Sequence, residues 1–88
     1  MDISKILKSP INLKLILFYH ENLSIVDTAQ SIAKWIEQDV SKVEKAIEEL
    51  VKENILVAHR SPHMVGYGYT QNIEIIRLID DYLKKRKK

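Results

Sequence analysis

Histidines and acidic side chains are the groups that could support catalysis or metal binding in this chain of 88 residues. His20, His59 and His63 stand on different expected elements, and no close-spaced carboxylate or thiolate completes a metal site. Asp80 and Asp81 are adjacent, so on a helix they point about 100° apart and do not form an acid–base pair. Cysteine is absent, which excludes thiolate nucleophiles and disulfides. We therefore expect no enzyme activity, no metal and no cofactor.

Aromatic residues alternate with glycine in the segment Gly66-Tyr67-Gly68-Tyr69. This segment is too short for a phosphate-binding loop and is typical of a strand in a hairpin. We expect close packing on the glycine face, with the two tyrosines covering the domain. Stacking of nucleic-acid bases on the tyrosines is the alternative. Trp35, the only tryptophan, is expected in the core.

Basic residues are concentrated at the end of the chain. Five of the 14 lysines and arginines are residues 84–88, whereas residues 1–83 carry 9 basic and 12 acidic side chains and a net charge of −3. The tail is either a solubilising end or an extension that adds salt-sensitive affinity for phosphates. Length and an apolar content of 45% predict a single domain over residues 1–84, followed by the tail over 85–88. Asp2, Lys5 and Lys8 interrupt any leader, so a soluble cytoplasmic protein is expected.

Helical periodicity and capping residues predict most of the elements. Residues 2–8 form a short amphipathic turn, and Ser9-Pro10 begins a helix to about residue 20 that is apolar almost all round. Asp27 is expected to cap a helix over 28–37, with Gln38 in the turn that follows. Asp39 is expected to cap the clearest helix, 40–53, which Asn54 ends in a left-handed conformation. The few glycines and the abundant isoleucine, lysine and glutamate also hint at a thermophilic source.

A hairpin and a last helix complete the pattern. Strands are expected over 55–60 and 65–70, and Thr70 is expected to cap a helix over 71–84. Apolar residues cover about 220° of that helix, more than the roughly 100° that one core requires. The excess favours a homodimer, although residues 2–8 could instead fold back and cover it. The expected dimer residues lie on the first long helix and the last helix: Leu13, Leu17, Ile75, Leu78, Ile79 and Tyr82.

This order of elements resembles the winged helix-turn-helix transcription regulators of bacteria and archaea, especially the small dimeric arsenical-repressor and multiple-antibiotic-resistance-regulator types. Residues 24–33 match the opening of the second helix, residues 39–50 match the recognition helix, and residues 54–57 stand at the entry to the wing. The resemblance implies a mainly helical α+β fold with a three-helix core, a two-stranded wing and a C-terminal helix. It also implies sequence-specific binding of double-stranded DNA by a homodimer.

The resemblance places the third helix in the major groove and the wing, about residues 55–70, on the DNA backbone. The candidate DNA contacts are hydroxyl, cationic and imidazole groups on the second helix, the third helix and the wing: Thr28, Ser31, Ser41, Lys42, Lys45, Arg60 and His63. Glu48, Glu49 and Glu53 on the third helix would repel phosphates, so a protein-interaction module without specific DNA binding is the alternative. No effector can be identified from the sequence.

Overall fold

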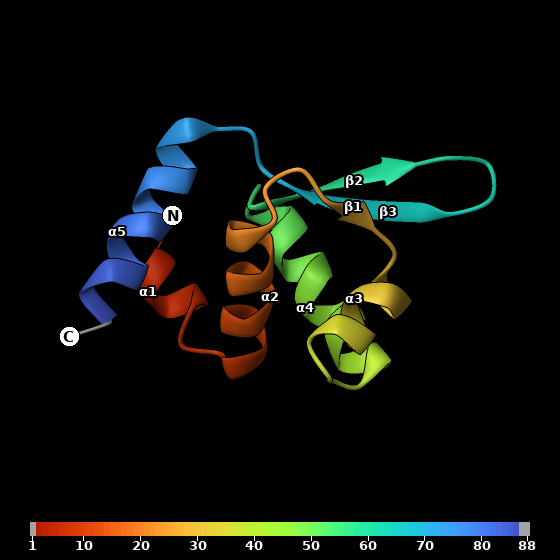
Figure 1. Ribbon diagram of the computed structural model, residues 1–88, viewed down its shortest axis with the longest axis horizontal. Coiled ribbons are helices and arrows are strands. Elements are labelled where there is room, and N and C mark those ends of the chain that lie inside the picture. Colours follow the sequence, from red (N-terminus) through yellow and green to blue (C-terminus); the bar gives the residue numbers. More distant parts are fainter. Residues whose placement is uncertain (1, 87–88) are drawn as a thin grey trace.

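A computed structural model describes residues 2–86, with five helices and three strands in that part of the chain (Figure 1). The elements follow the expected order, and residues 87–88 of the basic tail lie outside the described residues. Their bounds are α1 (Ile3–Ile6), α2 (Pro10–Glu21), β1 (Val26–Asp27), α3 (Ala29–Trp35), α4 (Val40–Lys52), β2 (Leu56–Arg60), β3 (Val65–Tyr69) and α5 (Ile73–Arg86).

Capping side chains fix where the helices begin. Ser9 caps α2, with Pro10 at its first position, and the Asp39 carboxylate accepts a hydrogen bond from the Lys42 amide at the start of α4, both as expected. Two expected caps are wrong by one or two residues. Thr28 caps α3 in place of Asp27, because Asp27 is held in a strand. Asn72 replaces Thr70 before α5, since its carboxamide oxygen accepts from the Glu74 amide at 2.9 Å.

Two residues with positive φ end the central helices. Asn54, with φ 61°, stops α4 in the expected left-handed conformation. Glu37 takes φ 56° in the turn between α3 and α4. The second helix therefore ends at Trp35, and Glu37 makes the reversal that was expected at Gln38.

The wing is larger than the expected two strands. β2 and β3 form the expected antiparallel hairpin, and β1 pairs with the other edge of β3, giving the order β1-β3-β2. Val26 of β1 lies opposite Gly68 and Asp27 opposite Tyr67. A methyl group at Gly66 would lie 2.9 Å from Cγ1 of Val26. Close packing on the glycine face is therefore confirmed, and its partner is β1.

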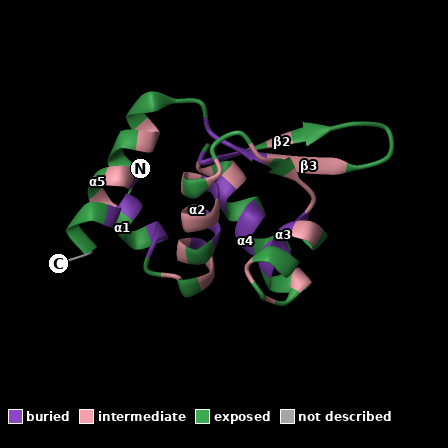
Figure 2. Ribbon diagram, in the orientation of Figure 1, coloured by how far each residue is buried: buried purple, intermediate pink, exposed green. Residues whose placement is uncertain are grey.

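The core lies around α2, which packs against α4 and β3 (Figure 2). Leu15, Ile16 and Tyr19 are fully buried on one face of α2, whereas its other apolar residues are only half-buried: Ile11, Leu13, Leu17 and Phe18. The Tyr19 hydroxyl donates to the Tyr67 carbonyl at 2.6 Å. Burial raises the pKa of Tyr19 well above its ordinary value.

Trp35 does not belong to this core. It is 68% exposed at the end of α3, with one face stacked on Phe18 at a ring separation of 6.4 Å. The expectation that Trp35 is buried is wrong, because α3 is only seven residues long and buries Ala29, Ile32 and Ala33 on its inner side.

Residues of α1 fold back onto α5, so part of the apolar surface of α5 is covered within the chain. Ile79 and Leu83 are buried on that side, and Ile79 is a core residue of this single chain. Ile79, expected at a dimer interface, therefore offers no free surface to a partner. Ile73 and Leu78 remain 62% and 51% exposed, so the cover is incomplete.

A polar cluster ties α5 to α2 and β3. His20 on α2 places Nδ1 3.2 Å from the Tyr69 hydroxyl and Nε2 3.1 Å from Oδ1 of Asp80. The Lys84 ammonium lies 2.9 Å from the other Asp80 oxygen. Hydrogen bonds from Lys84 and His20 hold the pKa of Asp80 below its ordinary value.

Within residues 2–86, no helix is long and apolar enough to cross a membrane.

Candidate nucleic-acid interface

Helices α3 and α4 form a helix-turn-helix unit whose starts are both held by side-chain caps. Thr28 Oγ1 accepts from the Ser31 amide at 3.2 Å, and the Asp27 carboxylate accepts from the Thr28 amide at 2.8 Å. Thr28 Oγ1 therefore caps the backbone of α3 as an acceptor, and its hydroxyl proton can still donate to a ligand. Ser31 is half-buried one turn further on.

The start of α4 carries its own capping cluster. The Ser41 hydroxyl donates to the Asp39 carboxylate at 2.5 Å, and the Lys42 amide donates to the same oxygen at 3.3 Å. Chiefly the bond from Ser41, and then the bond from Lys42, hold the pKa of Asp39 below its ordinary value. Ser41 is exposed, but its hydroxyl proton is already engaged, so toward a ligand it acts as an acceptor.

The exposed side chains of α4 carry balanced charge. The buried residues Val43, Ile47 and Leu50 define the inner side of the helix. Lysines and glutamates alternate over the rest, all exposed: Lys42, Glu44, Lys45, Glu48, Glu49 and Lys52. At helical spacing, Ser41, Lys45, Glu48 and Lys52 stand opposite the buried side, whereas Lys42 and Glu44 lie on opposite flanks.

The wing brings two predicted residues close to the helix-turn-helix unit. A cleft of about 390 Å³ separates the start of α3 from the wing, and both Thr28 and His63 line it. Gln30 and Glu44 line the same cleft. Ser61 closes the hairpin, its amide donating to the Met64 carbonyl at 2.9 Å, and this bond holds the exposed His63 at the tip.

Arg60 and the two lysines lie in separate neighbourhoods. Arg60, next to the hairpin loop, lines a cleft between the wing and α4 with Glu48 and Lys52. Lys42 and Lys45 line a different cleft, between α4 and the start of α2. The seven predicted residues thus surround α4 without forming one continuous patch.

Gln30 and Lys52 are candidate contacts that the sequence pattern did not single out. Gln30 is exposed in the first turn of α3, and Lys52 is exposed on the outward side of α4 beside Arg60. Gln30 stands three residues after Asp27, the spacing of a capping-box partner, but an exposed amide in the first turn of that helix is also a signal for ligand contact.

The three histidines lie on α2, β2 and the wing tip. Among residues 2–86, no three histidine, aspartate or glutamate side chains gather as metal ligands would.

Comparison with known proteins gives structural but not sequence matches. No protein-family model matches the chain, and no curated protein matches it. The homodimeric winged helix-turn-helix DNA-binding domain of a possible ArsR-family transcriptional regulator from Mycobacterium bovis superposes with a TM-score of 0.77 at 13% identity, over 97% of this chain and 75% of that one. The antimony-specific transcriptional repressor AntR superposes with a TM-score of 0.74 at 17% identity, over 94% of this chain and 72% of that one.

A possible transcriptional regulator from Methanosarcina mazei Go1 gives a TM-score of 0.68 at 16% identity, over 98% of this chain and 82% of that one. At such low identity these matches show the fold. The chain has a winged helix-turn-helix fold, as the sequence predicted, with the third strand β1 added to the wing.

Proposed function

We propose that this protein is a sequence-specific DNA-binding transcription regulator. The observation that carries the proposal is the arrangement around α4: an exposed first half with Lys42 and Lys45, the capped start of α3 beside it, and a wing that presents Arg60 and His63. Three structurally similar proteins described as transcriptional regulators or repressors support it. Nothing in this arrangement requires catalysis.

In the proposed complex, the first half of α4 enters the major groove and the wing lies along the backbone. Lys45 and Ser41 are directed outward near the start of α4, where the Lys45 ammonium reaches base edges or phosphates and the Ser41 oxygen accepts from a base edge. Thr28, Ser31 and Gln30 approach a phosphate beside the start of α3, and Arg60 and His63 contact the backbone from the wing. Glu48 and Glu49 lie further along α4, so the helix must enter by its first half to keep these carboxylates away from phosphates.

We also propose that the protein binds DNA as a homodimer through α2 and α5. Leu13 and Leu17 lie on the same stripe of α2 as His20, which contacts α5, and both are half-buried. Ile75 and Tyr82 of α5 are half-buried and Leu78 is 51% exposed. The Mycobacterium bovis domain of the same fold is homodimeric, which supports a dimer, whereas the choice of α2 and α5 is carried by the apolar surface described above.

Selection of DNA from a random library at physiological salt tests the function. We expect one enriched palindrome, because two symmetry-related α4 helices would read half-sites about one helical turn apart. The double variant Lys42→Ala/Lys45→Ala should then lose specific binding while keeping its circular dichroism spectrum. The control variant Lys5→Ala/Arg77→Ala removes the same amount of positive charge from α1 and α5 and should retain specific DNA binding.

A protein-docking module is the second candidate function, and Trp35 favours it. Trp35 is 68% exposed, and large exposed aromatic side chains are typical anchors of protein interfaces. Under this alternative, the random library yields no enriched sequence and the Lys42/Lys45 variant binds DNA no differently from the parent chain.

A further inference from the structure

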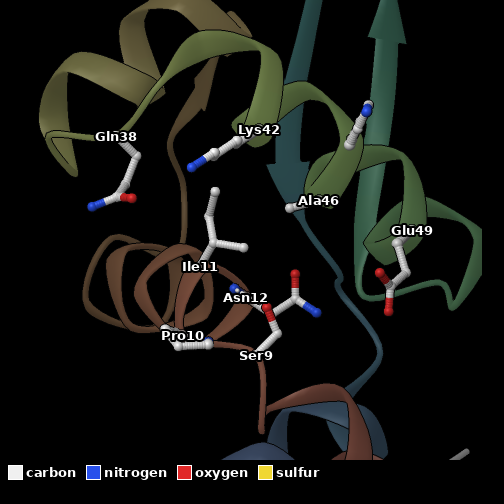
Figure 3. A pocket seen from close by; sticks show the side chains of 9 residues that line it. Ser9, Pro10, Ile11, Asn12, Gln38, Lys42, Ala46 and Glu49 are labelled. Atoms are coloured by element: carbon white, nitrogen blue, oxygen red, sulfur yellow. Dashed lines mark hydrogen bonds between the residues drawn. The ribbon is translucent and has the colours of Figure 1, made fainter.

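A cleft of about 420 Å³ lies between the start of α2 and α4 (Figure 3). Pockets of this size accommodate small molecules. Its lining residues come from the α2 start, the α3–α4 turn and α4: Ser9, Pro10, Ile11, Asn12, Gln38, Lys42, Lys45, Ala46 and Glu49. The lining thus combines apolar surface with groups of both charges.

Asn12 supplies a buried hydrogen-bond acceptor at this cleft. The residue is 2% exposed, and its Nδ2 donates to the Ile6 carbonyl at 3.0 Å. That bond fixes the orientation of the carboxamide, because a flipped group would place two oxygens together. Oδ1 is buried and has no hydrogen-bond partner among residues 2–86. In Figure 3 this oxygen points toward α4, so the acceptor faces the space between the two helices.

Opposite charges stand at the two ends of the cleft. Lys42, Ala46 and Glu49 follow one another at helical spacing along one side of α4. Figure 3 shows the Lys42 nitrogen directed over Ile11 toward Gln38, with the Glu49 carboxylate at the other end. The rise from residue 42 to residue 49 is about 10.5 Å in an α-helix. Lys42 and Glu49 thus stand at opposite ends of the cleft, and Ile11, Ala46, Asn12 and Lys45 line the part between them.

We propose that this cleft binds a dipeptide or a closely related peptide-like zwitterion. The ligand carboxylate pairs with Lys42, its ammonium pairs with Glu49, and its central N–H donates to Oδ1 of Asn12. Two extended residues span about 7 Å. With a hydrogen bond of about 2.8 Å at each end, such a ligand matches the spacing of positions 42 and 49 along α4. A free α-amino acid holds its charges too close together to do so.

Occupation of the cleft has a consequence that rests on the proposed function. Lys42 is one of the proposed DNA contacts, and a bound carboxylate would neutralise it and hold it toward α2. A dipeptide would therefore compete with DNA and act as an effector.

Nuclear magnetic resonance of the full chain without DNA tests the site. Glycylglycine is the probe, and the ¹H–¹⁵N spectrum should show saturable shifts at the amides of Ile11, Asn12 and Ala46. Three analogues each lack one of the binding groups: 5-aminopentanoate lacks the central N–H, N-acetylglycine lacks the ammonium, and glycylglycinamide lacks the carboxylate. Each should bind at least fivefold more weakly. Equal binding of all four probes, or no saturable shift with glycylglycine, would overturn the proposal.

Matched variants assign the binding to this cleft. Lys42→Gln and Glu49→Gln should each weaken glycylglycine binding at least fivefold. Lys52→Gln and Glu48→Gln make the same charge changes on α4 outside the cleft and should leave it unchanged. If the control pair weakens binding as much as the cleft pair, the shifts report a general charge effect and the proposed site is wrong.

Competition is measured separately, so that the site and the DNA-binding function can fail independently. Once a selected DNA sequence is available, glycylglycine should lower its apparent affinity, and 5-aminopentanoate should do so less. If glycylglycine binds without changing the DNA affinity, the cleft is still a dipeptide site but its role as an effector site is overturned. If no DNA sequence is selected, the proposed function is overturned, and the spectra still show whether the cleft binds the dipeptide.

Discussion

Gly66 and Gly68 of β3 are positions where the absence of a side chain decides how the wing is built. Val26 of β1 lies over both, and a Cβ at Gly68 would also lie 3.3 Å from Nε2 of His59. Glycine at both positions lets the Val26 side chain pack directly over the backbone of β3.

Gly66→Ala should therefore destabilise the protein by about 1 kcal/mol, as overpacking does at a closely packed site. The added methyl group would meet Cγ1 of Val26, a stiff β-branched side chain, at 2.9 Å. Urea denaturation measures the loss. Val26→Ala in the same chain should recover most of it, and full additivity of the two changes would show that they do not meet.

Thr28 offers a second test at the residue scale. Its hydroxyl caps the seven-residue helix α3, and loss of an N-cap typically costs about 1 kcal/mol. Thr28→Ala should lower stability by about that amount, whereas Thr28→Ser should not. If Thr28→Ala weakens DNA binding and Thr28→Ser restores it, hydrogen bonding by the hydroxyl accounts for the effect.

At the scale of elements, α5 is held to the rest of the fold by a polar contact as well as by apolar packing. Asp80 joins α5 to His20 of α2, and Lys84 supports it from the next turn. The Asp80 side chain is 38% exposed, so protons from the solvent can reach its carboxylate.

Acid should weaken this connection with a defined sign. The pKa of Asp80 in the folded protein lies below its ordinary value of 3.8, so the unfolded chain takes up the proton first as pH falls. The stabilisation is complete above that ordinary pKa and is lost as pH falls through the lower folded value. Asp80→Asn should lower the urea midpoint of unfolding at pH 7. Between pH 5 and pH 2, the urea midpoint of this variant should fall less than that of the parent chain. Asp81→Asn, on the exposed side of the same helix, serves as the control.

The molecule as a whole leaves part of its apolar surface uncovered. Helix α1 covers the side of α5 that holds Ile79 and Leu83. Leu78 stays exposed beside the half-buried Ile75 and Tyr82. A second copy of the chain would cover this remaining surface.

Light scattering of the full chain should give twice the monomer mass of 10.3 kDa. Leu78→Glu places a charge on the proposed interface and should produce monomers with weaker DNA binding. Leu23→Glu is a matched control, because Leu23 is similarly exposed, at 53%, on the loop after α2. A stable monomer for the parent chain would contradict the dimer.

The basic tail contributes at the same scale through long-range charge. If it binds DNA, replacing residues 85–88 with glutamine should reduce the slope of log affinity against log salt, by about 0.9 for each phosphate that the tail neutralises. Lys84 is kept, since it pairs with Asp80. An unchanged slope would show that the tail only solubilises the chain.

The order of the elements, the fold and most helix ends could be predicted from the amino-acid sequence. Those features depend on local chemistry: Ser9-Pro10 before α2, Asp39 before α4, Asn54 after it, and the apolar spacing of α4. Capping and periodicity act over a few residues, so they can be recognised without knowing what lies nearby in space.

Which surfaces remain free depends on how the elements pack in three dimensions. This packing paired β1 with β3, buried Ile79 under α1, left Trp35 exposed and placed Lys42 beside Asn12. Each of these outcomes depends on packing between segments distant in sequence, which no local pattern encodes. For the same reason, the candidate DNA contacts could be proposed from the sequence, but their separation into three clefts around α4 could not be predicted.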